Sequence, residues 1–102
     1  MINLNTARVT ATPAVHAWAT THPDRSAWLV ECLDRHHRDD WGDLDDHDRA
    51  ANVSAVVNAD GRIVSNYPLP DHLAGANPDS AVWIITDQDE PPIITILWPS
   101  DY

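Results

Sequence analysis

The hydrophobic period of the sequence changes within the stretch Asn58-Ala59-Asp60-Gly61-Arg62-Ile63-Val64-Ser65-Asn66-Tyr67. Before Gly61 the apolar residues recur at helical spacing, and Gly61 is free to take the positive φ that ends a helix. After it, alternation places Ile63, Ser65 and Tyr67 on one face of a strand and the residues between them on the other. The sequence therefore predicts helices before this stretch and strands after it.

Two further strands are predicted over residues 81–87 and 93–98, because both segments are rich in β-branched and aromatic residues and apolar on both faces. Apolar residues on both faces are typical of strands in the middle of a sheet. The acidic segment 87–92 joins these strands as a hairpin loop, whereas 68–80 is too long and too rich in proline for a tight turn. Arg8–Ala11 is the candidate for a further, short strand.

Three helices are predicted before the strands. Thr12 is a hydroxyl N-cap followed by Pro13 at the first helical position, which predicts a short helix to about Thr20. Pro23 begins a second helix in the same way, and one apolar stripe runs along it: Trp28, Leu29, Cys32, Leu33 and His36. Asp45 is the N-cap predicted for a third helix, whose modest inward face consists of Leu44, Ala51, Ala55 and Val56.

The chain has the length of one domain. We expect a single α+β domain over residues 1–102, with two or three N-terminal helices packed on a three- to four-stranded antiparallel meander. No apolar run approaches the roughly 18 to 20 residues that cross a bilayer, and residues 1–6 lack the features of a signal peptide. Cys32 is the single cysteine, so no internal disulfide forms. We therefore expect a soluble, cytoplasmic protein with a buried thiol.

The chain is strongly acidic. Sixteen acids, fourteen of them aspartates, face six arginines and no lysine, which leaves a formal net charge of −10. Such a chain repels the phosphates of free nucleic acid, so direct nucleic-acid binding is not expected. Selection for solubility, or a genome that encodes Asp and Arg in preference to Lys, accounts equally well for this balance.

The acids concentrate in residues 39–48, of which six are aspartates. This segment cannot be buried and must face water or a partner. If it were partly helical, it would span about 15 Å and carry six charges where duplex DNA carries about nine. This density favours a decoy surface that occupies a basic nucleic-acid channel, and the alternative is a solvated loop that leads into a helix.

Trp41 lies inside this acidic segment. An exposed tryptophan ringed by acids resembles an interface hot spot, and the alternative is that Trp41 folds back over the core. On the first interpretation, the predicted partner-binding residues are Asp39, Asp40, Trp41, Asp43, Asp45, Asp46 and Asp48.

Residues of metal-ligand type gather in the same region: His36, His37, Asp39, Asp40, Asp43 and His47. Their spacing matches neither a calcium loop nor a paired-histidine zinc motif, and no phosphate loop or nucleophile elbow is present. We therefore expect no enzyme and no cofactor. A small metal- or ligand-dependent enzyme that uses His36 and His37 is one alternative, and a self-associating homodimer that pairs an exposed edge strand is another. His36 otherwise closes the second helix, where its charge would suit the helix dipole.

Six short motifs occur in order along the chain: Ala11-Thr12-Pro13, Arg35-His36, Asp40-Trp41-Gly42-Asp43-Leu44, Arg62-Ile63-Val64-Ser65-Asn66-Tyr67, Trp83-Ile84-Ile85-Thr86-Asp87 and Thr95-Ile96-Leu97-Trp98-Pro99-Ser100-Asp101-Tyr102. With them, the chain from about residue 11 onward resembles a family of small bacterial proteins labelled plasmid-related or hypothetical. It departs from the family pattern at 68–80, which is longer here, and at Glu90-Pro91-Pro92. The resemblance implies no established activity. It implies residence on mobile elements, where small acidic proteins often inhibit CRISPR effectors or restriction enzymes.

Charge and resemblance together predict a protein-binding module that inhibits a nucleic-acid-handling host defence complex, as an anti-CRISPR or anti-restriction protein with the electrostatics of a DNA mimic. The expected partner is a basic nucleic-acid-binding protein or complex, with no membrane contact.

Overall fold

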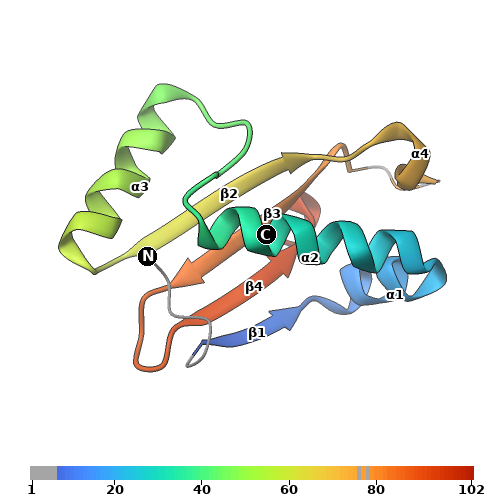
Figure 1. Ribbon diagram of the computed structural model, residues 1–102, viewed down its shortest axis with the longest axis horizontal. Helices are drawn as coiled ribbons and strands as arrows, with labels where there is room; N and C mark the ends of the chain where they lie inside the picture. Colours follow the sequence, from blue (N-terminus) through green and yellow to red (C-terminus); the bar gives the residue numbers. More distant parts are fainter. Residues whose placement is uncertain (1–6, 76, 78) are drawn as a thin grey trace.

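A four-stranded sheet with strand order β1-β4-β3-β2 carries the fold (Figure 1). The structure is a computed structural model and describes residues 7–75, 77 and 79–102, so residues 1–6, for which no signal peptide is expected, lie outside the described residues. The elements in chain order are β1 (Arg8–Ala11), α1 (Pro13–Thr21), α2 (Pro23–His37), α3 (Asp46–Asn58), β2 (Arg62–Pro68), α4 (Asp71–Ala74), β3 (Ala81–Asp87), β4 (Ile93–Leu97) and the 3-10 helix η1 (Pro99–Asp101).

The sheet is mixed. Strands β2, β3 and β4 form the predicted antiparallel meander, and the two strands with apolar residues on both faces, β3 and β4, are the central pair. Strand β1 is the predicted short strand, but it pairs parallel to β4, with Arg8 opposite Ile93 and Ala11 opposite Ile96. A purely antiparallel sheet was therefore the wrong expectation, because alternation in a sequence marks a strand without giving its direction.

Helices α1 and α2 pack on one face of the sheet (Figure 1). The alternation predicted for β2 is confirmed, since Ile63, Ser65 and Tyr67 are buried while the residues between them are only partly covered. His36 of α2 contacts Ser65 and Thr86, which identifies this face as the one that α2 covers. The core therefore lies between the sheet and the α1–α2 pair.

The predicted helix starts are confirmed. The Thr12 side chain accepts a hydrogen bond from the Val15 N–H, and Pro13 and Pro23 occupy the first helical positions of α1 and α2. Asp45 caps α3 as predicted. Helix α4 was not predicted, because its four residues lie in a segment whose prolines suggested only a loop.

Helix α3 lies beside strand β2, at the edge of the sheet (Figure 1). The Asn52 side chain is 2% exposed and makes the two hydrogen bonds to Val64 that a neighbouring strand would otherwise make. Its Nδ2 donates to the Val64 carbonyl at 2.7 Å, and its Oδ1 accepts from the Val64 N–H at 3.0 Å. The outward N–H and carbonyl of Val64 are thereby paired, which helps to protect this edge strand from association with other strands.

None of the helices in the described residues combines the length and the apolar character that a bilayer crossing requires.

Candidate functional site

The acidic segment 39–48 connects α2 to α3 and is fastened to the edge of β2. The Trp41 carbonyl accepts from the Asn66 N–H at 2.9 Å, and the Asp43 N–H donates to the Asn66 carbonyl at 2.7 Å. Gly42 sits between these bonds with φ +75°, and a Cβ there would lie 2.2 Å from the Asn66 carbonyl oxygen. Only glycine allows this approach, so Gly42 determines where the following aspartates emerge.

Trp41 lies in the core with 6% exposure. The expectation that it is an exposed anchor among the acids is therefore wrong, and the alternative that it folds back over the core is correct. The physical reason is that its own backbone pairs with β2, which directs the indole inward, where burial of a large aromatic side chain is favourable.

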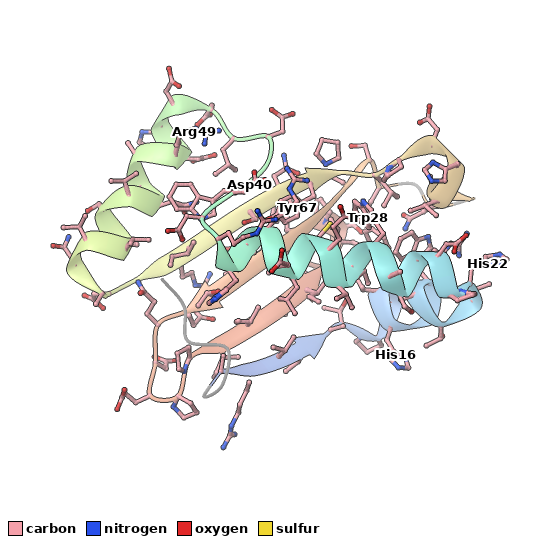
Figure 2. The ribbon with its side chains drawn as sticks, in the orientation of Figure 1. His16, His22, Trp28, Asp40, Arg49 and Tyr67 are labelled. Carbon is pink, nitrogen blue, oxygen red and sulfur yellow. The ribbon has the colours of Figure 1, made fainter. Side chains whose placement is uncertain are left out.

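Asp39 and Asp40 differ from the aspartates that follow them. Asp40 forms a bidentate pair with Arg35, at 2.8 and 3.2 Å, and this hydrogen bond holds the pKa of Asp40 below its ordinary value. The Asp40 carbonyl also accepts from the Tyr67 hydroxyl, so this residue closes the end of α2 against β2 (Figure 2). Asp39 has φ +62° and is partly buried. Arg35 already occupies the Asp40 carboxylate, and the Asp39 Oδ1 is buried without a partner among the described residues, so the prediction that these two residues face a partner finds no support in this geometry.

The remaining four aspartates, Asp43, Asp45, Asp46 and Asp48, are exposed at the start of α3. Asp45 is the N-cap, and its Oδ1 accepts from the Asp48 N–H at 2.8 Å. Among the described residues none of the four forms an ion pair with an arginine. The nearby Arg49 donates to the Gly42 carbonyl at 3.5 Å instead. These four carboxylates are therefore available to an external cation.

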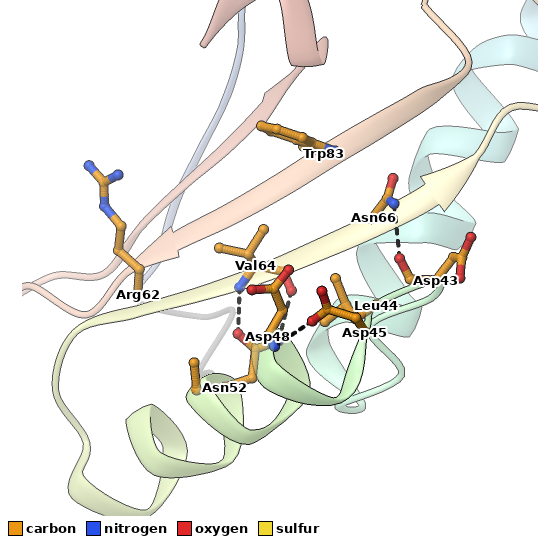
Figure 3. A pocket seen from close by; sticks show the side chains of 10 residues that line it. Asp43, Leu44, Asp45, Asp48, Asn52, Arg62, Val64, Asn66 and Trp83 are labelled. Carbon is orange, nitrogen blue, oxygen red and sulfur yellow. Dashed lines mark hydrogen bonds between the residues drawn. The ribbon is translucent and has the colours of Figure 1, made fainter.

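A pocket of about 520 Å³ opens between the start of α3 and the sheet face that α2 leaves uncovered (Figure 3). Its volume falls within the range of about 300–1,000 Å³ that is usual for ligand sites. Apolar and amide side chains form the walls, and three of the free aspartates stand beside them. The lining residues are Asp43, Leu44, Asp45, Asp48, Ala51, Asn52, Arg62, Val64, Asn66 and Trp83.

Carboxylates determine the charge of this pocket. Arg62 lies at one end, where its Nε donates to Asp87 at 2.8 Å and its Nη1 donates to the Tyr102 hydroxyl at 3.1 Å. Asp43 and Asn66 lie at the other end (Figure 3). Because Asp87 neutralises Arg62, the three lining aspartates leave the pocket negative. The site suits a cation with an apolar or planar body.

His36, one histidine of the alternative metal or enzyme site, points into the core and not toward these aspartates. His36 is fully buried; its Nδ1 lies 2.5 Å from Ser65 Oγ and its Nε2 lies 2.7 Å from Thr86 Oγ1. Burial, and to a smaller extent the neighbouring His37, lower the pKa of His36 to about 4. A protonated His36 at the helix end was therefore the wrong expectation, since the core holds the neutral imidazole.

Within residues 7–75, 77 and 79–102, no three side chains of His, Cys, Asp or Glu come close enough together to hold a metal ion. Cys32 is 1% exposed, as predicted, and burial raises the pKa of its thiol to about 12. A thiol with that pKa stays protonated at neutral pH and is a poor nucleophile.

Sequence reasoning missed Trp83, Asn52 and Asn66 as parts of the site. Trp83 lies on β3, which is apolar on both faces, and that pattern does not say which face a helix covers. The two asparagines carried a weak signal, since a polar side chain on the inward side of a helix or strand needs a hydrogen-bond partner.

Searches of protein-family models, of curated proteins and of solved structures found no match to this chain.

Proposed function

We propose that this protein is a mobile-element inhibitor of a host defence complex, and that it binds a basic nucleic-acid-handling protein through the acidic start of α3. The supporting observation is the group of four exposed carboxylates, Asp43, Asp45, Asp46 and Asp48, which no arginine of the described chain pairs. Unpaired surface charge of one sign steers a partner of opposite sign and speeds its association.

A second group of acids supports a larger acidic face. Gln88 binds the Ala55 carbonyl through its side chain and the Gly61 carbonyl through its backbone, which places the β3–β4 loop at the C-terminal end of α3 (Figure 1). Asp60, Asp89 and Glu90 are exposed there. Helix α3 has 13 residues and therefore spans about 20 Å. Seven acids flank a length over which duplex DNA carries about twelve charges, so the face has somewhat more than half the charge of DNA.

Two further acids, Asp87 and Asp101, have partners inside the molecule. Asp87 pairs with Arg62. Asp101 accepts from the Thr12 hydroxyl at 2.7 Å and from the Trp98 N–H at 3.1 Å. With Asp39 and Asp40 also excluded, the proposed surface is smaller than the sequence suggested and is centred on α3.

The test is affinity capture from a bacterial lysate with and without nuclease, followed by binding of the purified captured protein. We expect a nucleic-acid-handling protein that is captured in both conditions, that duplex DNA displaces, and that binds more weakly as salt rises. The variant Asp43→Asn with Asp46→Asn is expected to weaken binding about tenfold or more, because two close charge pairs are lost.

The matched control is Asp24→Asn with Asp71→Asn, which removes the same number of charges from the first turns of α2 and α4, away from α3 (Figure 1). This variant is expected to bind nearly as well as the parent. If both variants weakened binding equally, the overall charge of the protein and not the start of α3 would explain the binding. If the α3 variant bound with unchanged affinity, the proposed function would be rejected.

A further inference from the structure

We propose that the pocket between α3 and the sheet receives an arginine side chain of the basic partner, with Trp83 as the wall against which the guanidinium stacks. This inference rests on the proposed function and specifies its partner chemistry. The inference is based on the pocket and not on the acidic segment alone, because an aromatic ring and carboxylates line the same cavity.

Trp83 is placed for this role by the strand register. It lies opposite Asn66 on the sheet face turned away from α2, and it is only partly covered. The ring of Tyr102 meets its indole edge to face, with ring centroids 5.7 Å apart. This contact holds the indole in position and leaves it as part of the pocket wall (Figure 3). Tryptophan is the side chain whose face attracts cations best.

The pocket that Trp83 lines holds more hydrogen-bond acceptors than donors. Asp43, Asp45 and Asp48 line the pocket, and Asp45 uses only Oδ1 for its cap. Asn66 donates through Nδ2 to the Asp43 carbonyl at 2.9 Å, and its Oδ1 is buried without a partner among the described residues, so the acceptors open to a ligand are the carboxylates. A guanidinium has five N–H donors and no acceptor, which matches this set.

Arginine fits better than lysine for a geometric reason. Its planar guanidinium stacks on an aromatic face while its N–H groups reach carboxylates in the same plane, whereas an ammonium is a compact and strongly hydrated charge. The pocket supplies both the face and the carboxylates, so we expect discrimination between the two cations.

The test is an NMR titration of the protein at low salt with tetra-arginine amide and, in parallel, with tetra-lysine amide. We expect tetra-arginine to shift the amide signals of the pocket residues saturably and to bind more tightly than tetra-lysine. The variant Trp83→Leu should weaken tetra-arginine about fivefold and leave tetra-lysine nearly unchanged, and Trp83→Phe should retain most of the arginine affinity.

A second pair of variants changes residues of α3 and leaves the sheet unaltered. Ala51 lines the pocket from α3, while its neighbour Ala50 is exposed outside it. Ala51→Leu is expected to fill part of the cavity and weaken tetra-arginine, and Ala50→Leu is the control that leaves binding unchanged. Both substitutions keep a strong helix former.

Equal affinity for the two peptides, or no effect of Trp83→Leu and Ala51→Leu, would overturn the arginine pocket and leave the acidic face in place. Absence of any saturable shift at the pocket would also overturn it. The proposed function fails separately, through the comparison of Asp43→Asn with Asp46→Asn against its control.

Discussion

His36 links helix α2 to two strands through hydroxyl groups. A neutral imidazole has one N–H donor and one acceptor nitrogen, and Ser65 and Thr86 can each take either role. Because all three side chains are fully buried, the network has no contact with solvent. It stabilises the packing of α2 on the sheet and offers no access to a substrate.

The stability of the protein is expected to depend on pH through His36. Its pKa in the fold, about 4, lies below its ordinary value of 6.5. Between these values the unfolded chain binds a proton that the folded chain does not, so this contribution is complete above pH 6.5 and is lost as pH falls toward 4. From pH 7.5 to pH 5 we expect a loss of about 2 kcal/mol, measured by urea unfolding at both pH values.

The control for this effect is His36→Gln, which cannot bind the proton. This variant is less stable at pH 7.5 but should lack most of the pH dependence between 7.5 and 5. An imidazole signal of His36 that titrates near 6.5 in the folded protein would contradict the prediction.

At the scale of elements, the two edges of the sheet differ. Strand β2 is sealed by Asn52 and by the pairing of the acidic segment with Asn66. Strand β1 is a short edge strand with all four residues exposed, including Val9 at 46%. The hydrogen bonds that cover the β2 edge have a second role, because they also hold the start of α3 in place and thereby shape the pocket.

Asn52→Ala is expected to destabilise the protein by about 2 kcal/mol, because it leaves both the N–H and the carbonyl of Val64 unpaired in a partly buried position. Urea unfolding measures this difference. Asn58→Ala, on the same helix, removes only an exposed bond to Ser54 and should change stability by less than about 0.5 kcal/mol. Similar losses for the two variants would show that Asn52 does not seal the edge strand.

At the scale of the molecule, repulsion among acids opposes the compact state. Among the residues that the structure describes, three arginines form ion pairs with acids, at Asp34, Asp40 and Asp87, and all three pairs are partly exposed and therefore weak. The formal net charge of −10 is held within 39 × 29 × 22 Å. At about 10 mM salt the screening length is about 30 Å, so charges repel across most of the molecule.

Salt is therefore expected to stabilise the protein. Raising NaCl from about 10 to about 100 mM shortens the screening length to about 10 Å, and we expect the melting temperature to rise by a few degrees, which corresponds to ~1 kcal/mol. Thermal unfolding followed by circular dichroism measures the shift. A lower melting temperature at the higher salt would mean that the ion pairs outweigh the repulsion.

Local chemistry in the sequence determined the α+β class, the starts of α1, α2 and α3, the antiparallel β2-β3-β4 meander and the acidic character of residues 39–48. Caps, prolines and hydrophobic periods act within a few residues, so they can be recognised without the fold. Only the tertiary structure decided that β1 runs parallel to β4, that Trp41 turns inward, that Arg35 pairs with Asp40, and that Trp83 lines a pocket. Each of these depends on which distant segment packs against which face, and no local pattern in the chain encodes that choice.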